Sequence, residues 1–132
     1  MANKKDYRFT PHFSYAELTA SAVAKQLGLE NKPTTIQHYC GMSMTAHYLE
    51  YLRDKLKCAI YVNSCFRTKQ VNEGVGGHAN SYHMKGLAAD IWTKYHTPYE
   101  LVQIIKANPH PYLCVQIQQY QTFVHIEIVN FN

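Results

Sequence analysis

Apolar side chains recur at helical spacing through the first half of the sequence and alternate with polar ones in several later segments. Ser14 and Glu17 form a capping-box pattern that begins a helix, and Phe13 is placed to pack against its first turn. We expect this helix to end before Gly28. A second, longer helix follows Pro33. Its predicted buried stripe consists of Ile36, Cys40, Met44, Tyr48, Tyr51, Leu52 and Leu56.

The pattern changes period after this helix. In chain order it predicts a strand within 58–65, a short helix over 68–75, a buried strand over 87–92, a helix from Thr97 to near Asn108, and a hairpin of 112–119 with 122–129. Helices, strand, short helix, strand, helix and hairpin in this order predict an α+β fold, with a mainly antiparallel sheet and helices packed on one side. We expect one domain, residues 1–132.

Composition narrows the possible functions. With 46% hydrophobic and 17% charged residues the chain is typical of a globular protein. The net charge of +4 is mild and comes without a dense basic run, so nucleic-acid binding is not expected. No apolar run approaches the roughly 20 residues that a membrane span needs. The first thirteen residues lack the apolar region of a signal peptide, which predicts synthesis in the cytoplasm.

The four cysteines are scattered, without a C-x-x-C pair. This favours free, mostly buried thiols over a zinc–cysteine cluster. A different candidate metal site comes from His83 and Asp90, which stand seven residues apart with Gly86 between them. A loop that turns at Gly86 and enters a strand lets both side chains reach one point. The terminal strand offers His125, which shares a strand face with Glu127. Two imidazoles and a carboxylate suit Zn²⁺ and leave a fourth position for water.

The run Ser81-x-His83-x-x-Gly86-x-Ala88-x-Asp90, with the late His125, resembles the motif of the zinc D-alanyl-D-alanine carboxypeptidase family. Small phage and bacterial endolysins belong to that family, and Hedgehog signalling domains share its fold. Upstream, residues 62–68 are similar to the family's Ser-Gly-Tyr-Arg-Ser segment, residues 72–81 match the stretch that follows it, and residues 13–18 are similar to its first helix. The resemblance is therefore close to chain-long.

The resemblance implies a zinc peptidase fold and a set of roles. His83, Asp90 and His125 would be the zinc ligands. Arg67 would bind the substrate carboxylate or steady the oxyanion, and Ser81 would hydrogen-bond near the scissile carbonyl. The substrate would be a peptidoglycan stem peptide, cleaved by attack of metal-bound water in a D,D-carboxypeptidase or endopeptidase reaction. A phage-type route would carry such an enzyme to the cell wall.

The sequence departs from the family at one position. The family commonly places a carboxylate general base three residues before its last histidine, and that position here is Thr122. Segment 112–124 contains no Asp or Glu. Glu127 is the nearby candidate base, with a strand-edge carboxylate paired to a lysine as the alternative interpretation. Two functions therefore stay open: a zinc peptidase, or a catalytically impaired, zinc-containing binding module for cell-wall peptide or for a phage or wall assembly. His78 is either a solvated loop residue or part of the cleft.

Overall fold

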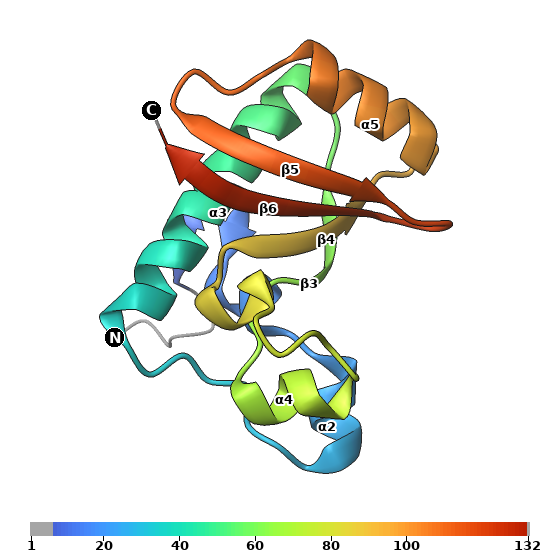
Figure 1. Cartoon of the computed structure of the whole chain (residues 1–132). Helices are drawn as coiled ribbons and strands as arrows, with labels where there is room; N and C mark the ends of the chain where they lie inside the picture. Colours follow the sequence, from blue (N-terminus) through green and yellow to red (C-terminus); the bar gives the residue numbers. More distant parts are fainter. Residues whose placement is uncertain (1–6, 132) are drawn as a thin grey trace.

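The protein is described by a computed structural model covering residues 7–131 (Figure 1). The first six residues, which belong to the segment searched for a signal peptide, lie outside this range. The elements in chain order are β1 (Arg8–Thr10), β2 (Phe13–Ser14), α1 (Tyr15–Thr19), α2 (Ala22–Leu27), α3 (Ile36–Leu56), β3 (Tyr61–Ser64), α4 (Lys69–Gly74), the 3₁₀ helix η2 (Tyr82–Lys85), β4 (Ala88–Trp92), α5 (Pro98–Ala107), β5 (Leu113–Gln119) and β6 (Val124–Phe131). The α+β class with antiparallel sheets is confirmed.

The main sheet has the strand order β3-β4-β6-β5, and each neighbouring pair is antiparallel. Strand alternation divides its side chains between two faces. Ile91, Val124 and Ile126 belong to the buried face, which joins one hydrophobic core with residues of α3 and α5. Asp90 and His125 lie directly opposite each other in the β4–β6 ladder, on the other face. That second face is the one that carries the polar side chains.

Helix α3 lies behind the sheet in Figure 1, but the stripe predicted for it is partly wrong. Ile36 is 78% exposed and Cys40 is exposed, whereas Leu52 and Leu56 are buried. The predicted stripe advanced mainly in steps of four residues, and each such step drifts by about 40° around a helix. Its two ends therefore fall on opposite sides. The buried face has i, i+3, i+4 spacing and consists of Met42, Thr45, Ala46, Leu49, Leu52 and Leu56, with Tyr48 beside it.

The first predicted helix is interrupted. Its capping box between Ser14 and Glu17 is confirmed, and so is its end at Gly28, whose φ is +65°. Between them Ala20 is extended and Ser21 caps a second helix by accepting a hydrogen bond from the backbone N–H of Ala24. Serine competes for backbone groups in this way and favours a new helix start over continuation. The β1–β2 hairpin, which the pattern did not indicate, precedes α1.

The later elements follow the prediction closely. Thr68 caps α4, and Thr97 caps α5 in a capping box with Glu100. None of the four cysteines, all of which lie within residues 7–131, forms a disulfide, as expected, but only Cys65 is fully buried and Cys40 is exposed. Within residues 7–131, no helix is both long and apolar enough to cross a membrane.

Candidate metal centre

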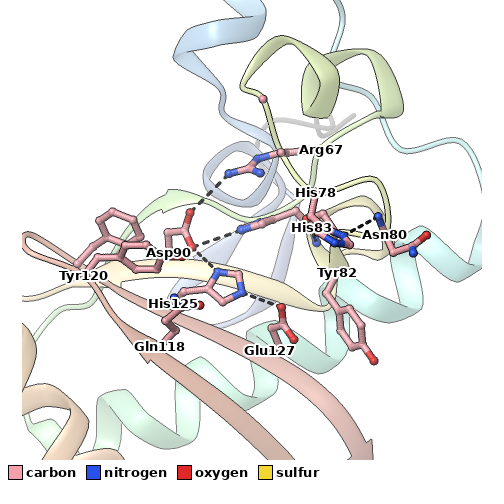
Figure 2. A pocket seen from close by; sticks show the side chains of 14 residues that line it. Arg67, His78, Asn80, Tyr82, His83, Asp90, Gln118, Tyr120, His125 and Glu127 are labelled. Atoms are coloured by element: carbon pink, nitrogen blue, oxygen red, sulfur yellow. Dashed lines mark hydrogen bonds and ion pairs between the residues drawn. The ribbon is translucent and has the colours of Figure 1, made fainter.

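Three side chains from separate elements meet on the open face of the sheet (Figure 2). His83 comes from η2, Asp90 from β4 and His125 from β6. One ligand atom of each lies within 4.8 Å of the others. His83 is 2% exposed and Asp90 8% exposed, so the cluster sits at the edge of the core. The structure thus brings together the three residues that the sequence predicted as metal ligands.

The segment that carries His83 is a single 3₁₀ turn, where a loop was expected. Ser81 begins it by accepting a hydrogen bond from the backbone N–H of His83 at 3.2 Å, and Gly86 ends it with a φ of +74°. The carbonyl of Gly86 accepts a hydrogen bond from the Thr45 hydroxyl at 2.6 Å. On α3, Gly41 allows a close approach, because a Cβ at this position would lie 1.9 Å from the carbonyl oxygen of Lys85. Helix α3 therefore sets the position of His83.

The imidazole of His83 has a defined tautomer. Its Nδ1 lies 2.6 Å from the backbone carbonyl oxygen of Cys65. A carbonyl can only accept a hydrogen bond, so Nδ1 carries a proton, and it is the neutral ring that leaves a lone pair on Nε2 for a metal. Nε2 lies 3.3 Å from Oδ1 of Asp90. A histidine that binds a metal through one ring nitrogen typically donates the N–H of the other to an acceptor such as the Cys65 carbonyl. This hydrogen bond orients the ring and raises its basicity.

His125 lies between two carboxylates. Its Nδ1 is 2.7 Å from Oδ1 of Asp90, and its Nε2 is 2.9 Å from Oε1 of Glu127. Burial alone would lower the pKa of His125, but hydrogen bonds with Asp90 and Glu127 outweigh it and raise that pKa. Burial would likewise raise the pKa of Asp90, but hydrogen bonds with the two histidines lower it well below its usual range. Asp90 is therefore an ionised carboxylate at neutral pH.

Arg67 approaches the same carboxylate. Its Nη2 lies 3.6 Å from Oδ2 of Asp90. The rest of the guanidinium is held by two side chains, because Nε donates to the Ser64 hydroxyl at 3.1 Å and Nη1 donates to Oδ1 of Asn72 at 3.3 Å. Arg67 thus has a fixed orientation and is no freely solvated surface cation. Asn72 is a site residue that the sequence analysis missed.

A cleft of about 520 Å³ opens beside these residues. Arg67, Ser81 and Glu127 all line it, so the three predicted catalytic residues share one cavity with the metal-ligand set. His78 also lines the cleft while it stays exposed in its loop, so each of the two interpretations describes part of its position. The hydroxyl of Ser81 is already an acceptor for the backbone of η2, and it keeps its own proton for donation.

Thr122, at the position where the family commonly carries its general base, lies outside the cleft lining. It lines a small neighbouring cavity with Ile91, although Phe123 borders both cavities. Glu127 is therefore the carboxylate beside the cluster, and its contact is with His125 where the sequence analysis had weighed a lysine. Gln118, directly opposite His125 on β5, also lines the cleft. Cross-strand register could have indicated Gln118, had the pairing been known.

The donor set fits a zinc ion. His83 can offer the Nε2 lone pair of its neutral ring, His125 lies beside the same carboxylate, and the carboxylate is ionised. Two histidines and one acidic oxygen are a common ligand set of catalytic zinc sites, which keep a further position open. The adjoining cleft supplies that opening. His83, Asp90 and His125 would hold the ion.

Comparison with known proteins agrees with this geometry. No curated protein matches the chain. A family model described as peptidase M15 matches residues 11–127, which includes every side chain of the cluster. Members of this family are metallopeptidases that generally use zinc. The chain accordingly belongs to the peptidase M15 family.

Proposed function

We propose that the protein is a zinc-dependent hydrolase of peptidoglycan stem peptides, acting as a D,D-carboxypeptidase or as an endopeptidase of the endolysin type. Membership of the peptidase M15 family supports a zinc peptidase with a peptide substrate. The observation that carries the proposal is that a metal-ligand set, an arginine and a carboxylate line the same cleft. The restriction to stem peptides rests on the motif around His83 and Asp90.

The chemistry divides between the ion and the side chains. Zinc, when bound, polarises a carbonyl oxygen and lowers the pKa of water to about 7. Arg67 has five N–H groups, and its three partners leave donors for a negatively charged oxygen of the substrate. Ser81 has a hydroxyl proton to donate at the cleft wall. Glu127 is the carboxylate placed to take up a proton.

A second function is favoured by the contacts of Glu127. Its Oε1 is hydrogen-bonded to Nε2 of His125 at 2.9 Å, an arrangement that orients a ligand. The position of the family's usual base is Thr122, which lies with a different cavity. A protein with Glu127 held in this way would bind zinc and a cell-wall peptide without rapid turnover. This binding module is the alternative proposal.

The two functions are separated by incubating zinc-loaded protein with purified stem pentapeptides and identifying products by mass spectrometry. The peptidase proposal expects hydrolysis that a chelator abolishes and that Asp90→Ala lacks. Release of the terminal D-alanine identifies a carboxypeptidase, and an internal cut identifies an endopeptidase. Peptide binding by the zinc-loaded protein without any cleavage overturns the peptidase and supports the binding module.

A further inference from the structure

We propose that His78 is a substrate-contacting hydrogen-bond donor of the cleft, and that Asn72 is the positioning residue that fixes it relative to Arg67. The inference rests on the proposed function, because it concerns how the same cleft holds a peptide. Figure 2 shows Arg67 and His78 along one side of the cleft, with His125 and Glu127 across from them. The motif comparison assigned neither Asn72 nor His78 a chemical role.

The side chain of His78 has a defined hydrogen-bonding direction. The backbone N–H of Asn80 donates to Nδ1 of His78 at 3.1 Å. A backbone N–H can only donate, so Nδ1 is the acceptor and the neutral ring carries its proton on Nε2. The ring lines the cleft and is exposed. His78 therefore offers an Nε2–H group to a carbonyl or carboxylate oxygen of a bound peptide.

The backbone of His78 is held more firmly than that of an ordinary loop residue. Its carbonyl oxygen accepts two hydrogen bonds, from Nδ2 of Asn72 at 2.9 Å and from the backbone N–H of Ser81 at 3.0 Å. The preceding residue, Gly77, donates its own N–H to the carbonyl of Asn72 at 2.9 Å. A side chain at Gly77 would collide with Asn72, because its Cβ would lie 2.2 Å from Oδ1.

Asn72 connects this loop to the arginine. It is 2% exposed, and its Oδ1 accepts a hydrogen bond from Nη1 of Arg67 while its Nδ2 donates to His78. A single buried amide thus fixes two donors of the cleft wall in one arrangement. Such a pair complements an oxygen that carries negative charge, and a pre-set geometry avoids the entropy loss of ordering each donor separately.

Steady-state kinetics on a stem pentapeptide tests the role of His78. We expect His78→Ala to lower kcat/KM by about 10- to 100-fold, the size of one hydrogen bond to a charged group. His78→Gln should retain most of the activity, because its amide nitrogen reaches the position of Nε2, whereas the shorter His78→Asn should resemble alanine. His47→Ala, at an exposed histidine of α3 outside the cleft, is the matched control. A change under twofold in His78→Ala overturns the proposal.

A double-mutant cycle tests the role of Asn72. Asn72→Asp keeps an acceptor for Arg67 but replaces the donor to His78 with a carboxylate oxygen, so we expect KM to rise more than kcat falls. If Asn72 acts through His78, the double variant with His78→Ala should have a kcat/KM only slightly below that of the less active single variant. Strictly additive effects on kcat/KM overturn the positioning role, since a general loss of structure would be additive.

Failure of this inference is distinguishable from failure of the proposed function. Two-bond ¹⁵N–¹H spectra of the protein report the tautomer of His78 without any turnover, and we expect the proton on Nε2. A proton on Nδ1 contradicts the inference even if the protein is an active peptidase. If no peptide is cleaved, addition of the pentapeptide should still shift the His78 ring signals. Unchanged signals under saturating peptide, with other cleft signals moving, overturn the substrate contact.

Discussion

The backbone carbonyl of Cys65 accepts a hydrogen bond of 2.6 Å from Nδ1 of His83, and this contact directs the opposite ring nitrogen toward Asp90. Cys65 is fully buried, so the oxygen that orients the imidazole belongs to a residue of the hydrophobic core. The geometry of His83 is therefore set by main chain and core packing together. The effects of substitutions at the other cleft residues can then be interpreted with the position of His83 unchanged.

Removal of the carboxylate ligand should abolish tight metal binding. Outer-shell partners of a metal typically change its affinity by 10- to 100-fold, so loss of Asp90 itself in Asp90→Ala should weaken zinc by more than about 100-fold. Competition with a chromophoric chelator measures the affinity. Asp54→Ala, at an exposed aspartate paired with Lys57, is the control. Equal affinity in Asp90→Ala and wild type would show that the ion binds elsewhere.

Substitution of Glu127 should separate chemistry from metal binding. If Glu127 is the general base, Glu127→Gln should lower kcat by about 10²- to 10⁴-fold, because an amide cannot take up a proton. The amide oxygen can still accept a hydrogen bond from His125, so the zinc content should stay near that of wild type. Stopped assays on a stem peptide, with metal analysis of the same sample, measure both quantities.

Two other results for Glu127→Gln would lead to different conclusions. Unchanged kcat would show that Glu127 is no base. A loss of zinc with a proportional loss of rate would instead assign Glu127 to the orientation of His125, with which it is hydrogen-bonded at 2.9 Å.

Zinc and protons should compete at His125. Burial opposes protonation of this ring, but Asp90 and Glu127 raise its pKa above the ordinary value of 6.5. In the metal-free protein the stability contributed by protonated His125 is fully present below about pH 6.5 and is lost as the pH rises through the raised pKa. Zinc needs the neutral ring, so zinc affinity should increase across the same interval. Urea unfolding with and without zinc, at pH values from about 6 to 9, measures the two opposite trends.

His125→Gln provides the reference for this pH dependence. It removes the titrating ring, so the metal-free variant should lose the decrease in stability above about pH 6.5. An unchanged pH profile in His125→Gln would assign the dependence to another group.

The contact between α3 and η2 should be intolerant of a single methyl group. Alanine is normally favoured over glycine in a helix by about 1 kcal/mol. At Gly41, however, the added Cβ would overlap the Lys85 carbonyl, and we expect Gly41→Ala to destabilise the protein by about 1–3 kcal/mol. The displaced turn carries His83, so zinc affinity should also fall. Urea denaturation and zinc titration measure both effects, and Gln37→Ala on the exposed side of α3 is the control. Wild-type stability in Gly41→Ala would contradict this account of the contact.

The centre of the site could be predicted because the motif around His83 and Asp90, together with its resemblance to a known family, indicated the ligand set. The spacing of His83 and Asp90 around a glycine, and the polar face of the strand with His125 and Glu127, both depend on local backbone periodicity. Local periodicity is what a sequence pattern reports most directly. The hairpin, α4 and α5 were predicted for the same reason, since their caps and alternation are local signals.

The meeting of His125 with His83 and Asp90 was expected from the family resemblance, but other long-range contacts were not predicted. The face of α3 that is buried depends on where the sheet and η2 lie, and Ile36 was placed on the wrong side. Arg67 lies in the loop after β3, and its partners include Asn72 on α4 and Asp90 on β4. No spacing rule joins these residues, because the chain turns between them. The contact of His125 with Glu127 also needed side-chain geometry, since strand alternation alone gives only a shared face.

Asp90 and His125 face each other across one rung of the β4–β6 ladder, so main-chain hydrogen bonding already fixes their separation. The site is therefore largely preformed before an ion binds, and binding loses little further conformational entropy. The polypeptide should consequently refold from denaturant in the presence of a chelator, and should regain its full zinc complement on later addition of the ion, without passing through an unfolded state.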